Sequence, residues 1–390
     1  MTGDGKHGRS HAGAELDLRG RLELGLWAVA WFVSPFYLVP QGLPQLYDLL
    51  LALQFVGMLL AGRLEFSRRA NPALAMLGAL VVYIALVGCV WAIVHELVAF
   101  VVPAFYYGFD LAVVVVALSL FHHHGSRFLR VTLWSWVLAI MVQVVLVSVM
   151  PPGYAGVRGL AFFNDPNQLA VYGVAGGVLI AQVARRVGVR SWLEVAGTVL
   201  VGALVVASVS RAGFLAFVAL VVVRFTARPR MIVAGLLIGG LGVLLFPWEL
   251  LPIDFVQERL ARAAQESTST LVHDRGYTRI FEYPQYLLLG AGEGMLSRFG
   301  QAIEIHSTPG TLLFCYGIPG VVLFFGACLR ILVSASPREG ILLLPLLVLS
   351  MFHHTLRMRF FWLNLAFAII SGLVREPAAR SGRRGDSAGR

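Results

Sequence analysis

The chain has 390 residues, 58% of them hydrophobic and only 13% charged, with a formal net charge of +10 and a mean hydropathy of +0.78. A soluble domain carries roughly a quarter charged residues, so this composition, with long apolar runs over most of the length, excludes a water-soluble globule and indicates a polytopic membrane protein. The positive charge then suits a bilayer surface, and no nucleic-acid partner is expected.

The apolar runs predict an all-α fold with about twelve transmembrane helices of ~17–25 residues each. In chain order the expected spans are 22–40, 44–62, 73–94, 98–121, 128–150, 168–184, 192–209, 212–226, 231–248, 308–332, 339–355 and 359–375. Helices one to nine therefore occupy residues 22–248, and helices ten to twelve occupy residues 308–375. Polar ends at 1–21 and 376–390 flank them, and the second of these ends is basic.

Residues 249–307 separate the last three expected spans from the first nine. This stretch is too polar to cross a bilayer and too long for a tight turn, which predicts a large external loop. Within it, "PIDFVQERLARAAQ" places apolar residues at helical spacing. We therefore expect the loop to be partly helical, with an amphipathic helix lying on the membrane surface.

The basic residues predict the orientation of the helices. With a cytoplasmic N-terminus, most of the 31 Lys and Arg residues fall in cytoplasmic segments, and both termini are cytoplasmic. Cations that remain on the outer side break this bias and are therefore candidates for function. They are Arg158, Arg211, Arg259, Arg262, Arg275, Arg279, Arg298, Arg357 and Arg359.

Polar residues recur where helices are expected to begin on the outer side. The sixth helix follows "RGLAFFNDPNQLA", which contains Arg158, Asn164 and Asn167. Asp165 precedes Pro166 and should be extended, and Asn167 can cap the helix. Helix starts offer free N–H groups and partial positive charge, which suits an anion.

Three later helix starts have the same character. The eighth helix begins at "VSRAG", where Ser210 can cap and Arg211 lies beside it. The tenth begins at "EIHSTPG", where Ser307 or Thr308 can cap and Pro309 suits the first turn. The twelfth begins at "HHTLRMRFFW", which carries Arg357 and Arg359.

The external loop adds "HDRGYTRIFEYPQYLLLGAGEG". Asp274 can cap a helix in which Arg275 and Arg279 lie four residues apart on one face. This helix would run to the glycine turn at Gly290, with a bend near Pro284. Arginines from distant segments would then converge near His306, which suits the pyrophosphate of a membrane lipid. No carboxylate cluster with metal spacing is evident, so arginine would stabilise the leaving group in place of a divalent ion, and neither metal nor cofactor is expected.

These segments resemble the O-antigen ligase and polymerase family of membrane glycosyltransferases. The matching segments are "GLAFFNDPNQLA", "SRAGFLAF", "RGYTRIFEYPQYLLLGAGEG", "EIHSTPGTLLFCYGIPG" and "HHTLRMRFFW", in the family's order over roughly residues 150–370. The resemblance implies a bacterial inner-membrane protein with its active site on the periplasmic side. It also implies an undecaprenyl-pyrophosphate-linked oligosaccharide as donor, with a flippase and a chain-length regulator as pathway partners beside membrane lipids.

The resemblance implies roles for individual residues. His306 matches the family's loop-end histidine, the proposed general base, and Arg211 with the Arg275 and Arg279 pair would grip the donor pyrophosphate. The family has one key loop arginine, and Arg279 is the favoured candidate because it lies nearer the glycine turn. The predicted catalytic residues are His306, Arg211 and Arg279; the predicted pyrophosphate ligands are Arg211, Arg275, Arg279, Arg357 and Arg359; the predicted acceptor-sugar ligands are Asn164, Asn167, Glu293 and Glu304.

The chemistry of the residues is compatible with these roles. An acceptor hydroxyl must lose its proton as it attacks, and a histidine near neutrality can take that proton. Arginines stabilise the charge that grows on the departing pyrophosphate. In-line attack would invert the anomeric carbon, so the expected activity is inverting and metal-independent.

Each assignment has a structural alternative. His306 could be an interfacial residue and Arg211 an anchor at the membrane surface. Glu293 could be a solvated acid or an alternative base. The three histidines from His122 to His124 splay round a helix end and are not expected to bind metal. Asp110 falls within a span, where it is either functional or paired with Tyr106 or Tyr107.

Three classes of function remain open at this point: a glycan-transferring enzyme, which is either a polymerase or a ligase, a transporter, and a non-catalytic scaffold. The favoured one is an O-antigen or exopolysaccharide polymerase, which transfers glycan to a sugar hydroxyl of another lipid-linked repeat unit. A ligase in lipopolysaccharide synthesis would use the same donor and transfer the glycan to lipid A–core. A polysaccharide or lipid transporter or flippase would need polar groups near the bilayer midplane and broken helices, whereas the charges here gather at one face. A non-catalytic scaffold would leave the outer arginines unexplained.

Overall fold

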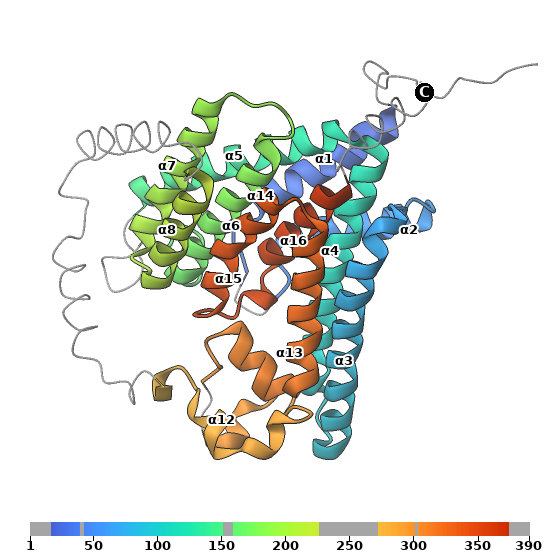
Figure 1. Cartoon of the computed structure of the whole chain (residues 1–390), viewed down its shortest axis with the longest axis vertical. Helices are drawn as coiled ribbons and strands as arrows, with labels where there is room; N and C mark the ends of the chain where they lie inside the picture. Colours follow the sequence, from blue (N-terminus) through green and yellow to red (C-terminus); the bar gives the residue numbers. More distant parts are fainter. Residues whose placement is uncertain (1–16, 40–42, 151–158, 226–271, 301–302, 374–390) are drawn as a thin grey trace, which may run out of the picture.

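The computed structural model describes residues 17–39, 43–150, 159–225, 272–300 and 303–373 (Figure 1). Every regular element in these ranges is helical, as expected. The longer helices are α1 (Leu18–Val33), α2 (Leu46–Leu60), α3 (Asn71–His95), α4 (Val102–His124), α5 (Ser126–Val149), α6 (Pro166–Ala184), α7 (Ser191–Ser208), α8 (Arg211–Phe225), α13 (Thr308–Ser334) and α16 (Arg359–Leu373). The expected span 231–248, the surface helix, Arg158, Arg259, Arg262 and the tail 376–390 lie outside the described residues.

Six helical segments in the described ranges are long and apolar enough to cross a membrane. They are Arg68–His95, Val98–His124, Ser126–Val149, Pro166–Ala184, Ser191–Ser208 and Thr308–Ser334. α2 and α16 are also apolar but shorter. A set of this kind is compatible with a multi-pass membrane protein, and it includes six of the spans that the hydropathy pattern predicts.

The expected span 339–355 is not a single helix. It is divided into α14 (Pro337–Gly340), the 3-10 turn Ile341–Leu343 and α15 (Leu344–Ser350). Pro345 lies in the first turn of α15 and lacks the N–H that a continuous helix would need there. Hydropathy recognised the apolar content of this stretch and missed its division.

α6 lies at the centre of the bundle, and nearly all of its residues are buried. Its neighbours α5, α7, α8 and α16 (Figure 1) come close because α6 carries glycines on more than one face. A methyl group at Gly176 would come within 2.7 Å of Ile140, and one at Gly177 within 2.6 Å of Leu220. Small residues allow such close helix packing where lipid supplies no hydrophobic driving force.

α13 is broken near its middle, and the break receives the glycine turn of the loop. Gly317 has φ 63° and ψ −167°, and Pro319 has no N–H to donate to the Cys315 carbonyl. The free carbonyls of Phe314 and Cys315 instead accept hydrogen bonds of 2.8 Å each from the backbone N–H groups of Ala291 and Gly292. Backbone groups left open in an apolar helix are thereby satisfied, and the turn is held against α13.

Charged helix ends gather at the end of the molecule opposite α12 (Thr278–Glu282) (Figure 1). Glu23 of α1 lies 2.9 Å from His124 Nε2 at the end of α4 and 3.3 Å from Arg63, which follows α2. Arg186, which follows α6, pairs with Glu339 of α14 at 2.7 Å. These are helix ends that the charge bias assigns to one side of the membrane, so their grouping agrees with the predicted alternation of helix directions.

Candidate functional site

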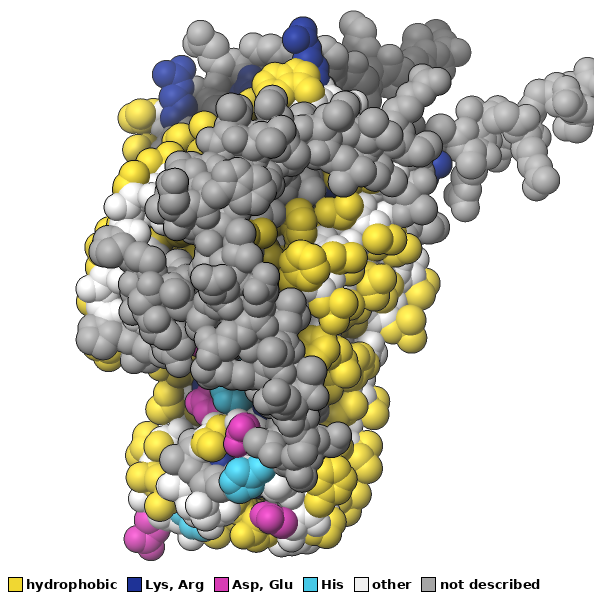
Figure 2. Space-filling model, turned by 90° about the vertical axis from the view of Figure 1, so that its left-hand side faces the viewer, with side chains coloured by type: hydrophobic (Ala, Val, Ile, Leu, Met, Phe, Trp, Pro, Cys, Tyr) yellow, Lys and Arg dark blue, Asp and Glu magenta, His cyan; other side chains and the backbone are white. Residues whose placement is uncertain are grey.

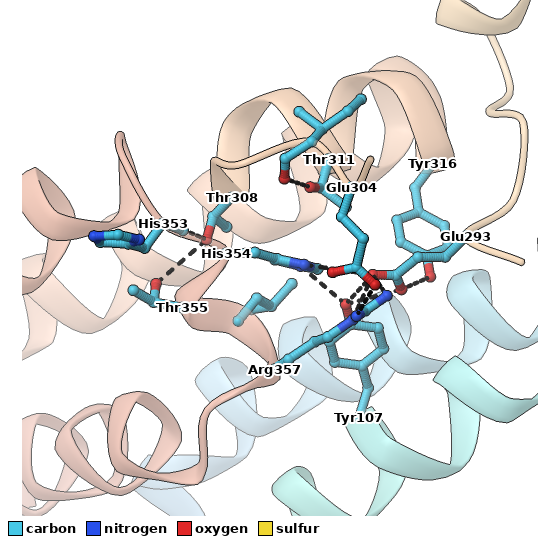
Figure 3. A network of polar contacts seen from close by, with 12 residues as sticks. Tyr107, Glu293, Glu304, Thr308, Thr311, Tyr316, His353, His354, Thr355 and Arg357 are labelled. Carbon is cyan, nitrogen blue, oxygen red and sulfur yellow. Dashed lines mark hydrogen bonds and ion pairs between the residues drawn. The ribbon is translucent and has the colours of Figure 1, made fainter. Parts of the chain in front are cut away.

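Glu293 lies at the centre of a polar cluster near the loop end of the bundle (Figure 3). Its side chain is 1% exposed. The hydroxyls of Tyr316 on α13 and Tyr107 on α4 donate to Glu293 Oε2 over 2.6 Å and 3.0 Å. Arg357, which precedes α16, donates from Nε to Glu293 Oε1 over 2.8 Å, and its Nη2 lies 2.7 Å from the same oxygen. Four segments that are far apart in the chain therefore meet at one carboxylate.

The donors around Glu293 keep it ionised. Burial raises the pKa of Glu293, but Arg357, His354 and the two tyrosine hydrogen bonds outweigh burial and hold this pKa below its ordinary value. A general base works best with a pKa near the working pH. Glu293 is therefore poorly suited to remove a proton and well suited to orient Arg357.

Arg357 extends from this buried acid toward the surface. Its Nη1 lies 2.8 Å from Oε1 of Glu304, and the two side chains are 32% and 53% exposed. One edge of the guanidinium is thus fixed by Glu293, while the other edge contacts the exposed acid Glu304. A phosphate or carboxylate from outside would compete with Glu304 for that edge.

His354 completes the buried part of the cluster. Its Nδ1 lies 3.5 Å from Glu293 Oε1, and its Nε2 lies 3.1 Å from the Tyr107 hydroxyl. The side chain is 9% exposed, and burial lowers the pKa of His354 to about 4. The ring is therefore neutral near pH 7. It packs between the acid and the tyrosine and links the segment before α16 to α4.

His306 lies on the exposed side of the same region. Its backbone N–H donates to the Arg275 carbonyl over 3.2 Å. The Arg275 guanidinium is half-buried, donates from Nη1 to the Phe352 carbonyl over 3.4 Å and lies over the Phe352 ring at 5.9 Å. Figure 2 shows acidic and histidine side chains exposed at this end of the molecule, beneath a broad hydrophobic surface. His306 is therefore accessible beside Arg275 and the Glu304 segment.

Two other loop arginines are enclosed by protein. Arg279 in α12 is fully buried, and its Nη2 donates to the Ile303 carbonyl, next to Glu304. Arg298 donates to the Ala291 carbonyl of the glycine turn. Its guanidinium carbon lies 5.0, 4.7 and 4.6 Å from the ring centres of Trp91, Phe100 and Phe299, a cation–π arrangement. These contacts suit arginines that shape the loop, and a direct phosphate contact by Arg279 stays a prediction.

The helix expected to carry Arg275 and Arg279 on one face is interrupted. α12 begins at Thr278, so Asp274 does not cap it, and Arg275 lies in the preceding turn. Gly276 has φ 69°, a left-handed conformation that breaks a helix. α12 then ends before Pro284, because a residue that precedes proline disfavours the helical conformation. The two arginines still lie in one loop, but not on one helical face.

Arg359 belongs to a separate buried cluster. Its Nε lies 2.6 Å from Asp48 Oδ1 on α2 and 3.8 Å from Asp110 Oδ1 on α4. Its guanidinium also covers the rings of Tyr47 and Phe109 at 5.6 and 5.1 Å. The expected pairing of Asp110 with a neighbouring tyrosine is wrong for Tyr107, whose hydroxyl binds Glu293 instead.

Arg357 and Arg359, expected together at the donor site, therefore serve two different sets of acids. They are only two residues apart in the chain. Glu293 and Glu304 belong to the loop, whereas Asp48 and Asp110 are enclosed in the bundle. The two arginines that the sequence predicted in one site therefore lie in two different clusters, and Arg357 belongs to the accessible one.

The remaining predicted residues lie at the starts of α6 and α8. Arg211 is the exposed first residue of α8, whose main neighbours are α15, α6 and α7, and Ser210 caps α8 as expected by accepting from the Gly213 N–H over 3.2 Å. Asn164 is exposed and Asn167 half-buried before and within α6. Their predicted roles in binding the donor and the acceptor stay predictions.

Two other expected caps can be compared with the structure. Asp165, not Asn167, caps α6, since its side chain accepts from the Asn167 N–H, and Asp165 is extended as its position before proline requires. Ser307 caps α13 by accepting from the Gly310 N–H over 3.0 Å. An aspartate before Pro166 is better placed because its carboxylate reaches the second N–H of the helix.

Sequence reasoning missed Tyr107, Tyr316 and His354 as members of the cluster. His354 lies in the "HHTLRMRFFW" segment already noted for its arginines, so its position offered a signal. The tyrosines lie inside apolar helices, where an aromatic residue is ordinary and gives no signal of its own. Among the described residues no group of three or more His, Cys, Asp or Glu side chains could hold a metal ion.

The loop cluster is thus built from both predicted and unpredicted residues. Arg275, Arg279, Glu293, Glu304, His306 and Arg357 come together there, while Arg359 binds a different pair of acids. No protein-family model matches the chain, and no curated protein gives a significant sequence match.

Proposed function

We propose that the protein is a membrane-embedded glycosyltransferase of the O-antigen polymerase type. It would transfer a glycan from an undecaprenyl-pyrophosphate donor to a sugar hydroxyl of a lipid-linked repeat unit. The observation that carries the proposal is the cluster of Arg357, Glu304, Arg275 and His306 at one end of an apolar bundle. Such a place can be reached by a lipid-anchored anion and by a water-soluble glycan together.

In this proposal the acceptor oxygen attacks the anomeric carbon while the bond to the pyrophosphate oxygen breaks. His306, which is exposed, takes the hydroxyl proton. Arg357 replaces its contact with Glu304 by one with the departing pyrophosphate, whose growing charge it stabilises. Glu293 holds Arg357 in place throughout, and Arg279 and Arg298 keep the loop in shape. The products are an inverted glycosidic bond and undecaprenyl pyrophosphate.

The finer topology belongs to the same proposal. We infer about twelve spans, cytoplasmic termini and a periplasmic loop over residues 249–307, in a bacterial inner membrane. The bias of the arginines supports it, as does the grouping of Glu23, Arg63, His124 and Arg186 at the end opposite the loop. On this topology the polar cluster faces the periplasm, where lipid-linked repeat units would be joined.

The test is an in vitro assay with a defined undecaprenyl-pyrophosphate oligosaccharide and purified protein. A ladder of longer products supports polymerisation, and activity should survive a chelator. His306→Ala should lower the rate by a factor on the order of 10²–10⁴, and Arg357→Gln by about 10²–10³. His273→Ala, an exposed histidine of the same loop, is the matched control and should leave the rate unchanged.

Each outcome of the assay bears on one part of the proposal. If the wild-type protein forms no product with either the lipid-linked repeat unit or lipid A–core as acceptor, the glycosyltransferase proposal is wrong. Full activity in His306→Ala removes the base assignment but not the reaction. When lipid A–core is supplied, one-step transfer to it in place of a ladder identifies the ligase alternative, because donor and leaving group are the same in both reactions.

Two observations favour a transporter as the second candidate function. α13 is broken at Gly317, and a charged cluster around Arg359 lies inside the bundle; both features occur where transporters bind substrates. Here, however, the free carbonyls at the break are bonded by Ala291 and Gly292, and Asp110 is fully buried. Transport of a fluorescent lipid-linked glycan across proteoliposomes, without formation of a new glycosidic bond, would favour this candidate.

A further inference from the structure

An apolar groove lies between α5, α6 and α7, away from the loop cluster. Its volume is about 430 Å³, and its lining is almost entirely apolar. Trp134 on α5 and Trp192 on α7 line it and are 51% and 58% exposed. Tryptophans that are partly exposed beside apolar surface are typical of the boundary between lipid and water.

Arginines surround one end of this groove. Arg130 precedes the lining residues Leu133 and Trp134 by one helical turn on the same face of α5. Arg185 directly follows the lining residue Ala184, and Arg190 lies two residues before Trp192. The three chain segments that form the groove therefore each bring a cation to the same end of it.

The segments that form the groove contain few acids. Residues 126–190 of α5, α6 and their connections include one acid, Asp165, at the far end of α6, and α7 adds only Glu194. Glu194 is buried and lies 3.8 Å from Arg224. Arg130 and Arg190 are exposed, and Arg185 Nε is buried without a hydrogen-bond partner among the described residues. Glu339 of α14 is bound to the neighbouring Arg186, so among the described residues this end of the groove carries an excess of positive charge.

We propose that this groove binds one phospholipid with an anionic headgroup, its acyl chain along the groove and its phosphate at Arg130, Arg185 and Arg190. An acyl chain gains little by leaving the bilayer for the groove, because both surroundings are apolar. Selection among lipids must therefore come from the headgroup, and clustered arginines beside helices at one membrane surface attract anionic lipids. This site is independent of the glycosyltransferase proposal, since none of its residues belongs to the loop cluster.

Native mass spectrometry of the full chain, titrated with phosphatidylglycerol or phosphatidylcholine of identical acyl chains, tests the site. Wild-type protein should retain one phosphatidylglycerol more tightly than phosphatidylcholine. Arg130→Gln with Arg190→Gln should lower that preference about five-fold for each arginine. The matched control is Arg68→Gln with Arg69→Gln, two exposed arginines in the 3-10 turn before α3, which removes the same charge and should leave the preference unchanged.

A second variant tests the groove itself. Ala196→Phe adds a ring to a lining position and should reduce binding of both lipids while leaving the thermal unfolding temperature close to that of wild type. Equal loss of preference in the control pair would mean a general charge effect and overturn the proposal. A wild-type protein that shows no preference for phosphatidylglycerol, or whose binding of both lipids Ala196→Phe leaves unchanged, would overturn it too.

Discussion

At the scale of single residues, two arginines define two environments. Arg357 and Arg359 each face two acids, yet Arg357 reaches the surface with a 32% exposed side chain and Arg359 is enclosed at 14%. An enclosed ion pair adds little net stability, but removing one partner strands a charge. The exposed pair can exchange Glu304 for an external anion. Exposure, more than residue type, separates the candidate binder from the structural residue.

The enclosed cluster predicts that two substitutions lower the free energy of unfolding by different amounts. Arg359→Gln leaves Asp48 and Asp110 buried without a cation and should cost about 3–5 kcal/mol of unfolding free energy. Asp110→Asn removes the acid that lies farther from Arg359 and should cost less than about 1 kcal/mol. Thermal unfolding in detergent compares them, with the exposed Arg330→Gln as control. A larger loss in Asp110→Asn than in Arg359→Gln would contradict this view of the cluster.

The loop cluster predicts that stability falls in acid. The folded-state pKa of His354 is about 4, below its unfolded value of about 6.5, so the unfolded chain binds the proton first. The contribution of His354 to the free energy of unfolding is fully present above about pH 6.5. It is lost as the pH falls toward 4, by about 3 kcal/mol in total. Glu293, whose pKa is also lowered, adds to the loss at the acid end.

Unfolding temperature measured between pH 7.5 and 4 checks this expectation. In His354→Gln the decline between pH 6.5 and 4 should flatten, because the neutral amide does not titrate. In the exposed control His273→Gln the decline should match that of wild type. An unchanged slope in His354→Gln would show that this imidazole does not control the acid sensitivity.

At the scale of elements, the broken helix α13 and the glycine turn form one unit. The break frees two carbonyls, and the turn supplies two N–H groups. Neither segment satisfies its backbone alone in an apolar environment. Because Glu293 follows the turn directly, the fit between turn and break places the carboxylate beside Tyr316 on α13. The position of the cluster therefore depends on backbone hydrogen bonds between two elements.

Gly290 and Gly300 both have a positive φ, but only Gly290 is packed closely against another element. Substituting each of them therefore distinguishes the cost of the backbone conformation from the cost of a steric clash. Gly290 has φ 98°, and an added methyl group there would collide with the Cys315 carbonyl; Gly300 has φ 76° with no atom within 4 Å of that position. Gly300→Ala should cost only the left-handed conformation, about 1–2 kcal/mol. Gly290→Ala should cost more, and it should raise the alkylation rate of the buried Cys315 in a Cys89→Ser background. Equal effects of the two substitutions would contradict a close fit of turn and helix.

At the scale of the whole molecule, the bundle has two chemically different ends. One end gathers ion pairs of arginines with Glu23 and Glu339, and the other carries the loop cluster. Between them, helices such as α3 and α5 expose large hydrophobic side chains, among them Val82, Leu86, Leu138 and Val145. A hydrophobic surface between two polar ends is what a spanning bundle requires.

This arrangement predicts opposite labelling of two exposed serines. Ser297 lies in the loop near the polar cluster, and Ser191 begins α7 at the arginine-rich end. In a Cys89→Ser background, a membrane-impermeant thiol reagent added to intact cells should label Ser297→Cys and spare Ser191→Cys. Both should react after the membrane is opened. Labelling of both in intact cells, or the reverse pattern, would contradict the proposed topology.

The sequence by itself determined the helical class, the positions of the six long apolar helices among the described residues and the caps Ser210 and Ser307. Hydropathy, helix periodicity and proline are local properties, so they can be evaluated without knowing which segments are neighbours. The loop arginines, Glu293, Glu304 and His306 were also recognisable, because charged residues stand out in an apolar chain. Short motifs in "GAGEG" and "HHTLR" therefore located the loop cluster in outline.

Only the tertiary structure decided which of these residues meet. It joined Tyr107, Tyr316 and His354 to Glu293, separated Arg359 from Arg357, and divided the expected span 339–355. Each outcome depends on packing between segments more than 20 residues apart, or on how a proline-containing stretch fits its neighbours. The free energy of burying a charge depends on those neighbours, and no local pattern in the chain contains that information.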